Sequence, residues 1–288
     1  MDFLRFCEVT IGPLADWQGG GPKANAVKLR ADGTTSNLRV MFSAAKSITG
    51  DPNKTELTIF NLSANLRQAI RANLARVQVV AGYDSNPLSA ALVSSGALTG
   101  VISTRSGGDV ATKMTILDGF GGMVRGAVSK SYAGSTRLDQ IIRETAAGMP
   151  GVIVGKVALP GRVAAKGVQV AGGTTDALNK LADQYGFSWS VQNGVLQAIM
   201  DNADTGDAYS FSSRSNLISI TPMLDGPTQT ENGVEIVAKF EARPKPGDRL
   251  NVQSDLNPRL SGTYRATNVM LDFDSHGAAT FRAQATTL

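Results

Sequence analysis

The stretch Glu56-Leu-Thr-Ile-Phe-Asn-Leu-Ser63 carries the signals that decide the fold of this chain. Leu57 and Ile59 fall on one face of a β-strand and the residues around them on the other, because strand side chains alternate with period two. Ser63 can then cap a helix through its hydroxyl oxygen. Four apolar residues follow at helical spacing, namely Leu66, Ala69, Ile70 and Leu74. The stretch predicts a strand, a turn and a short helix.

More strands are predicted on both sides of this unit. Residues 77–81 form one strand, and residues 82–87 are expected to be a loop. Residues 97–104 and 111–117 pair as a hairpin around Gly107-Gly-Asp109, since glycine supplies the positive φ that such turns need. Short alternating runs separated by turn residues continue up to about Gly119, which is typical of antiparallel β structure. We predict an N-terminal β domain over residues 1–120.

The middle of the chain has a different pattern and predicts an α/β insert over residues 121–203. One helix is expected after Ser135 or Thr136, and a second after Thr174 or Thr175, ending at Gly186. Residues 187–191 and 195–199 then flank Asn193-Gly194, a strong signal for a type I′ hairpin. No structure is assigned to residues 150–165.

Residues 204–288 return to β structure. Strands are expected over residues 218–221, 233–240, 249–253, 262–271 and 278–285, with turns that include Arg243-Pro-Lys-Pro-Gly247. The predicted fold is therefore mainly β, with two antiparallel barrel or sandwich domains, 1–120 and 204–288, flanking the α/β insert.

Composition excludes several classes of protein. A single Cys7 cannot form an intrachain disulfide, and Cys7 with His276 cannot supply the ligands of a typical structural zinc site. Asp2, Arg5 and Glu8 interrupt what a signal peptide would need to be apolar. No window approaches the roughly 18 apolar residues that span a bilayer. We expect a soluble protein that is made and kept in a cytoplasm.

The charge is mildly positive and unevenly distributed. Lys and Arg number 28 against 24 Asp and Glu, a net charge of +4. Residues 121–170 hold seven basic and two acidic residues; the basic ones are Arg125, Lys130, Arg137, Arg143, Lys156, Arg162 and Lys166. Nucleic-acid platforms for single strands interleave such charges with aromatic residues, and only Tyr132 is present here. A solvated basic face is favoured over a surface that follows a phosphate backbone.

Motifs for nucleotide binding and hydrolysis are missing from the sequence. In residues 151–156 the glycine spacing is too short for a phosphate-binding loop, and Val157 stands where Ser or Thr is needed. His276, the single imidazole, lies in Asp274-Ser-His-Gly277 without a nucleophile elbow, so we expect it at a solvated hairpin tip.

The acidic residues do not indicate an active site or a metal site either. A glycosidase needs two carboxylates at a set separation, and nothing selects a pair among Glu56, Glu144, Glu231 and Glu235. Asp201, Asp204 and Asp207 lack the calcium-loop pattern and are interpreted as a polar linker between domains. We expect no enzymatic activity, no catalytic residue, no cofactor and no bound metal.

Several motifs, taken in order, resemble a known family. Leu57-Thr-Ile-Phe-Asn-Leu-Ser63, Val77-Gln-Val-Val-Ala-Gly-Tyr83 and Leu98-Thr-Gly-Val-Ile102 are similar to the N-terminal domain of baseplate hub proteins of tailed bacteriophages. The segments with Thr175-Asp-Ala-Leu and Pro244-Lys-Pro-Gly-Asp-Arg-Leu250 resemble the insert and the closing β domain of that family. The resemblance covers the chain from about Asn53 onward.

The resemblance implies a homotrimer with two tube-like β domains per subunit, so that six such domains form a ring around a channel. The implied partners are the tail tube protein, the spike or needle protein, the tape-measure protein and other baseplate proteins, with transient passage of phage DNA and no membrane. The implied location is the baseplate of the virion, after assembly in the host bacterial cytoplasm. Because the chain ends at Leu288, spike and lysozyme domains are expected to be separate proteins.

Three turns are expected to contact neighbouring subunits, because a closed ring needs heterologous contacts made by strand edges and loops. They contain Asn61, Leu62 and Ser63; Gly82 and Tyr83; and Pro244 and Gly247. Arg137 and Lys156 are candidates to face the channel. Two alternatives stay open: a peptidoglycan-degrading tail hydrolase, and a hexameric tail-tube or distal-tail protein, which would have a single β domain.

Overall fold

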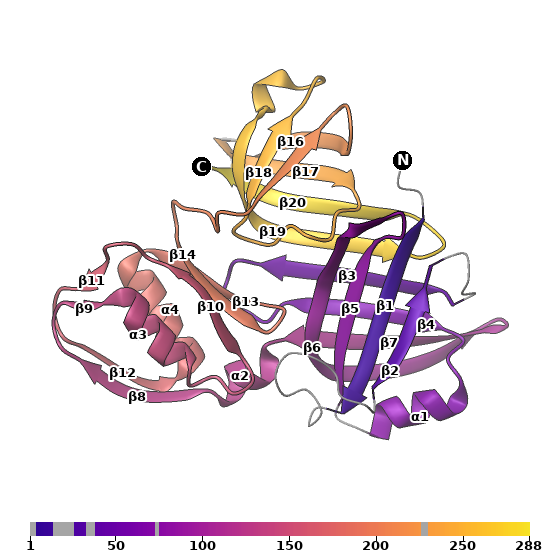
Figure 1. Cartoon of the computed structure of the whole chain (residues 1–288), viewed down its shortest axis with the longest axis horizontal. Helices are drawn as coiled ribbons and strands as arrows, with labels where there is room; N and C mark the ends of the chain where they lie inside the picture. The colour runs from indigo at the N-terminus through magenta and orange to yellow at the C-terminus, as the bar shows by residue number, and fades with distance from the viewer. Residues whose placement is uncertain (1–3, 14–25, 33–37, 73–74, 226–229) are drawn as a thin grey trace.

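The computed structural model describes residues 4–13, 26–32, 38–72, 75–225 and 230–288. Most strands belong to one 13-stranded sheet, in which a continuous path of neighbours runs β16-β17-β20-β19-β3-β4-β7-β6-β5-β1-β2 (Figure 1). Its N-terminal strands are β1 (Arg5–Pro13), β2 (Val27–Ala31), β3 (Val40–Ser47), β4 (Lys54–Phe60), β5 (Ala75–Tyr83), β6 (Asn86–Ser106) and β7 (Asp109–Asp118). Its C-terminal strands are β15 (Ala208–Ser212), β16 (Leu217–Asp225), β17 (Thr230–Lys239), β18 (Arg249–Gln253), β19 (Gly262–Asp274) and β20 (Ala279–Thr287). We call this sheet and its core the β platform.

The first and last parts of the chain are joined by the antiparallel pairing of β3 with β19. The register runs from Ser47 opposite Asn268 to Met41 opposite Asp274. Both strands alternate buried and solvent-facing residues, so their apolar sides enter one core that is continuous over the N-terminal and C-terminal strands. The predicted β domains therefore share a sheet, and their boundaries at residues 120 and 204 remain a proposal.

The insert has its own core. A separate cluster of buried side chains runs from Met123 to Met200. Its helices are α2 (Phe120–Arg125), α3 (Leu138–Ala146) and α4 (Thr174–Tyr185), and its strands are β8 (Ala127–Tyr132), β9 (Thr136–Arg137), β10 (Ile153–Ala158), β11 (Val163–Ala164), β12 (Val168–Gly173), β13 (Phe187–Gln192) and β14 (Val195–Met200). Helices α3 and α4 pack on each other; α3 contacts β10, and α4 contacts β12 and β13. Figure 1 shows the insert beside the platform, with β9 and β11 at its far end.

Local sequence signals explain several of these elements. Helix α1 (Ala64–Ala72) begins after Ser63, whose Oγ accepts a hydrogen bond from the Leu66 N–H at 3.3 Å, as predicted. Leu74, the last residue of the predicted helical pattern, lies outside the described residues. Asn193 and Gly194 both have positive φ, 57° and 84°, which confirms the type I′ turn between β13 and β14.

Other local expectations were wrong. Residues 82–87 are a tight turn between β5 and β6, since both strands extend into it and Tyr83 pairs with Asn86. Both predicted helices are present, but α3 is preceded by Arg137 and α4 by Gly173, so none of the predicted capping hydroxyls caps a helix; these are Ser135, Thr136, Thr174 and Thr175. The unassigned residues 150–165 contain β10, which pairs in parallel with β14.

Within the described part of the chain, no helix is both long and apolar enough to cross a membrane.

Candidate functional site

The turn with Asn61, Leu62 and Ser63 is fixed to the β6–β7 hairpin near its tip, at the first two residues of β7. Asn61 has a φ of 56° and donates from Nδ2 to Asp109 Oδ1 at 2.9 Å, and its Oδ1 accepts from the Val110 N–H at 2.9 Å. Asn61 and Ser63 are exposed, whereas Leu62 is buried in the platform core. The turn offers a rigid polar surface next to a projecting hairpin.

The turn with Gly82 and Tyr83 is also rigid. A Cβ on Gly82 would lie 2.8 Å from Ala90 Cα, so only glycine permits this close approach of the two strands. The Tyr83 N–H donates to Ser89 Oγ at 2.7 Å. Leu88, directly after the turn, is 82% exposed. The turn thus presents an apolar side chain on a fixed backbone.

The turn with Pro244 and Gly247 lies inside the subunit. Pro244, Pro246 and Gly247 are buried, and Gly247 has a φ of 94°. A Cβ on Gly247 would approach Ile199 Cδ1 to 2.8 Å, and the Pro246 carbonyl accepts from Gln197 Nε2 at 2.7 Å. This turn therefore contacts the insert of its own chain.

Arg137 and Lys156 are both exposed but lie on different elements of the insert. Arg137, on β9, donates from Nη2 and Nε to the Asp139 carboxylate at 2.7 and 2.9 Å. Lys156, on β10, lines a cleft of about 450 Å³ between the insert and the platform. The two side chains do not form one basic patch.

Sequence reasoning missed the most organised feature, a polar seam where the insert meets the platform. Asn53 Nδ2 donates to the Val191 carbonyl at 2.8 Å, and Gln192 Nε2 donates to the Ser47 carbonyl at 2.8 Å. Arg265 Nη1 donates to the Met200 carbonyl at 3.2 Å. These side chains come from distant positions, and nothing in their local sequence indicates that they meet. The sequence predicts the Asn193-Gly194 turn, which lies in the seam, but not its contact with the platform.

The centre of the seam holds two buried charges of opposite sign. Asp118, at the end of β7, is 2% exposed and accepts from the backbone N–H of Asn193. Lys46, on β3, is 5% exposed and lies 3.5 Å from Asn193 Oδ1. Burial raises the pKa of Asp118 to about 7 and lowers that of Lys46 to about 8, because both groups lose hydration.

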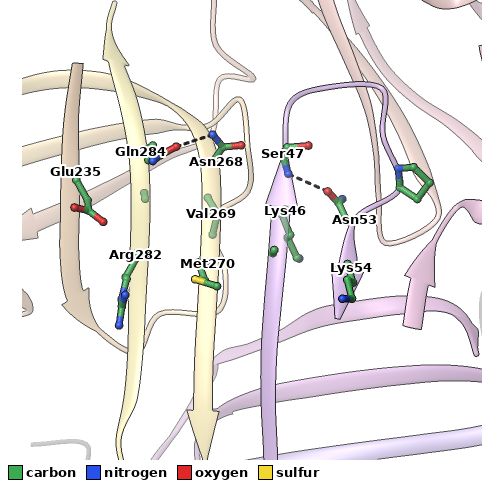
Figure 2. A pocket seen from close by; sticks show the side chains of 13 residues that line it. Lys46, Ser47, Asn53, Lys54, Glu235, Asn268, Val269, Met270, Arg282 and Gln284 are labelled. Carbon is green, nitrogen blue, oxygen red and sulfur yellow. Dashed lines mark hydrogen bonds between the residues drawn. The ribbon is translucent and has the colours of Figure 1, made fainter. Parts of the chain in front are cut away.

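A shallow groove of about 410 Å³ lies across the junction of the N-terminal and C-terminal strands. Figure 2 shows its lining from β17, β20, β19, β3 and β4, with Met270 near the middle and Arg282 and Lys54 toward opposite sides. Hydrogen bonds from Asn268 to Gln284 (2.8 Å) and from Ser47 to Asn53 (2.9 Å) fix the polar end of the groove (Figure 2).

The residues considered for chemistry are dispersed. His276 lies at the exposed β19–β20 turn, as predicted, with Nδ1 2.9 Å from Ser275 Oγ. Glu56 forms ion pairs with Lys54 and Lys113 on the surface of the sheet. Among the residues that the structure describes, no group of three or more His, Cys, Asp or Glu side chains could hold a metal ion. The organised features are exposed turns, a groove and the interface between insert and platform, which is the pattern expected of a protein that works by assembly.

The family of the chain agrees with this class. The family model described as baseplate hub gp41 matches residues 26–287. The chain belongs to this family of phage baseplate hubs, and it is a structural component of a phage tail. The resemblance noted in the sequence and the mainly β fold with an α/β insert are confirmed, and the hub assignment replaces the tail-tube and distal-tail alternatives. A search of curated proteins found no match.

Solved structures with the same fold include two tail proteins and a component of a type VI secretion system. The 43 kDa tail protein of prophage MuSo2 from Shewanella oneidensis superposes with a TM-score of 0.64 at 9% identity, covering 97% of this chain and 96% of that one. A tail protein from Neisseria meningitidis MC58 gives 0.64 at 13% identity, with the same coverage. The E. coli c3393 protein, a type VI secretion component described as similar to the T4 tail proteins gp27 and gp5, gives 0.59 at 12% identity, covering 89% and 75%.

Proposed function

We propose that three copies of this chain form a closed ring that links the tail tube to the central spike and surrounds a channel for phage DNA and the tape-measure protein. The ring assembles in the host cytoplasm and does no covalent chemistry. The observation that carries this proposal is the sheet path, which within the described residues ends in two different strands, β2 and β16. Joining unlike edges of successive copies gives a heterologous contact, and such contacts form a ring when the rotation between successive copies closes.

The β16 edge has the character of a contact surface. Among the described strands, β16 pairs only with β17. Its side chains Ile218 and Leu224 are 57% and 53% exposed; the strand contains no Lys or Arg, and its one protecting feature is Pro222, beside an irregularity in the pairing with β17. A long apolar edge strand invites pairing with another chain, so a neighbour is expected to cover it.

The turns and the insert supply the remaining docking surfaces. The turns with Asn61 and with Gly82 and Tyr83 are rigid and partly exposed, so we assign them to contacts with neighbouring subunits or other baseplate proteins. The Pro244–Gly247 turn supports these contacts indirectly by holding the insert. Arg137 and Lys156 face the channel or the tape-measure protein; their modest charge avoids tight binding of DNA in transit.

The contact is tested by the mass of the assembled protein in solution, measured by light scattering over a concentration series. The wild type is expected as a trimer of three times 30.1 kDa. Ile218→Lys and Leu224→Lys should lower the trimer fraction at least tenfold, because each places a charge on the apolar edge. Val124→Lys, at a side chain 66% exposed on helix α2 of the insert, is the control. Trimers that persist unchanged in both edge variants would contradict the assigned contact.

A further inference from the structure

The insert is joined to the platform by two chain segments and by an interface made mainly of hydrogen bonds, with Trp189 and Ile199 packed against Gly50 and Gly247. The segments are Gly119, which follows β7 with a φ of 68°, and residues 201–207 between β14 and β15. The apolar cores of insert and platform are separate clusters of described residues. Interfaces between domains that are polar and lack a shared core permit relative motion. The seam therefore decides whether the insert stays closed against the platform.

Asn193 is the residue that closes the seam over its buried charges. Its backbone N–H donates to Asp118, its Oδ1 lies 3.5 Å from Lys46 Nζ, and its Nδ2 donates to the Leu92 carbonyl at 2.6 Å. Asn193 also borders the cleft of about 450 Å³, so one side of the turn faces open space rather than packed side chains. Movement of this turn away from the platform would therefore break a contact to each of the two charged groups at once.

We propose that the Asn193-Gly194 turn is a proton-controlled latch, which holds the insert on the platform by closing over Asp118 and Lys46 and exposes both to solvent when it opens. The proposal concerns a single subunit and stands whether or not the ring forms.

Charged and polar groups from several neighbouring elements surround Asp118 and Lys46. Asp118 faces Lys46 on β3, Arg76 on β5 and the backbone N–H groups of Asn193 and Gly194. Lys46 faces Asp118 and, from the turn before β18, both Lys245 and Asp248. For each group, lost hydration outweighs these partners. The closed latch thus disfavours the charged form of both side chains.

The two shifts act in opposite directions along the pH scale. The pKa of Asp118 rises from 3.8 to about 7, so the closed state holds an extra proton between these values and loses stability as the pH rises through 7. The pKa of Lys46 falls from 10.5 to about 8, so the closed state loses stability as the pH falls through 8. The latch is therefore weakest near neutral pH, and it tightens toward acidic and toward alkaline pH.

Hydrogen exchange measured by mass spectrometry on the full chain, corrected for the intrinsic rate at each pH, tests the latch between pH 5 and 9.5. Exchange of β13 and β14 through opening should be greatest near neutral pH and fall toward both acidic and alkaline pH, by at most about tenfold per pH unit on each side. Platform strands β3, β4 and β19 should stay protected throughout. Trp189 gives a second reading, because its ring lies against Gly50 across the seam. Its quenching by acrylamide in a Trp17→Phe background should follow the same profile.

Three substitutions distinguish a proton-controlled contact from packing that does not depend on pH. Asp118→Asn should remove the acidic side of the profile and Lys46→Met the alkaline side, while Asp139→Asn, a half-buried carboxyl elsewhere on the insert, should change neither. A profile that is flat, or that keeps both sides in both variants, overturns the proposal. The proposal is also overturned if the hydrogen exchange of the insert and that of the platform always rise together. If Asp118→Asn does not fold, Lys46→Met carries the test, since persistence of the alkaline side in it is equally decisive.

Discussion

Phe42 on β3 and Phe273 on β19 stack face to face, with ring centroids 5.0 Å apart and planes 2° from parallel. Phe240 meets both rings edge-on, at 6.3 and 5.3 Å. The three rings come from the first and last parts of the chain, so they make the N-terminal and C-terminal strands one packing unit. Such pairs stabilise a core beyond the area that they bury.

Phe273→Ala should therefore lower the free energy of unfolding of the whole platform by about 3–5 kcal/mol, because it leaves a cavity in the shared core. Urea unfolding followed by circular dichroism measures the change. His276→Ala, at the exposed turn of the same hairpin, should have an effect within about 0.5 kcal/mol. Loss of only the C-terminal strands, with β4 and β7 intact, would show that the two sets of strands fold separately.

Gly50 is predicted to tolerate no side chain. A Cβ there would lie 2.4 Å from Trp189 Cζ2, so Gly50→Ala must push the insert away from the platform. We expect a loss of about 1–3 kcal/mol and a change in Trp189 fluorescence. Gly108→Ala is the matched control, because a Cβ at Gly108 meets nothing within 4 Å. Equal melting temperatures for the two variants would rule out a tight contact at Gly50.

Cys7 should be unreactive in the folded protein. It is 0% exposed, and burial raises the pKa of its thiol far above the ordinary value, so the nucleophilic thiolate is scarce at neutral pH. Labelling with a disulfide reagent at pH 8 should proceed only at the rate of unfolding and become fast in urea. Complete labelling within seconds in native buffer would contradict the burial of β1.

Substitution of Glu56 tests how much its surface ion pairs with Lys54 and Lys113 contribute to stability. Hydrogen bonds from Lys113 and Lys54 lower the pKa of Glu56 to about 2, so its contribution to stability is present above pH 4.5 and lost as the pH falls through 2. The side chain is 37% exposed and screened by water, so Glu56→Gln should cost less than about 1 kcal/mol at pH 7. Thermal unfolding at low and high salt measures this stability cost. A cost above about 2 kcal/mol would show that the ion pairs are shielded from solvent.

Sequence reasoning recovered those elements whose signals are local. The strand ending at Phe60, the Ser63 cap and the Asn193-Gly194 turn all depend on neighbouring residues, and the structure has each of them. The β3–β19 pairing could not be predicted, because strands of similar pattern offer many equivalent partners and register depends on the whole core.

The seam was unpredictable for a related reason. Asp118 and Lys46 are ordinary charged residues in the sequence, and only the closed chain removes them from water. The turn with Pro244 and Gly247 shows the same limit: its composition indicates an exposed turn, but residues of β14 cover it. Burial by segments that are distant in the sequence cannot be inferred from the local sequence.

Electron microscopy of the purified, assembled protein tests the proposed ring most directly. Class averages viewed along the symmetry axis should show three copies in a ring, with six β lobes around an open channel and three inserts. Averages with six copies, or a compact particle without a channel, would contradict the account.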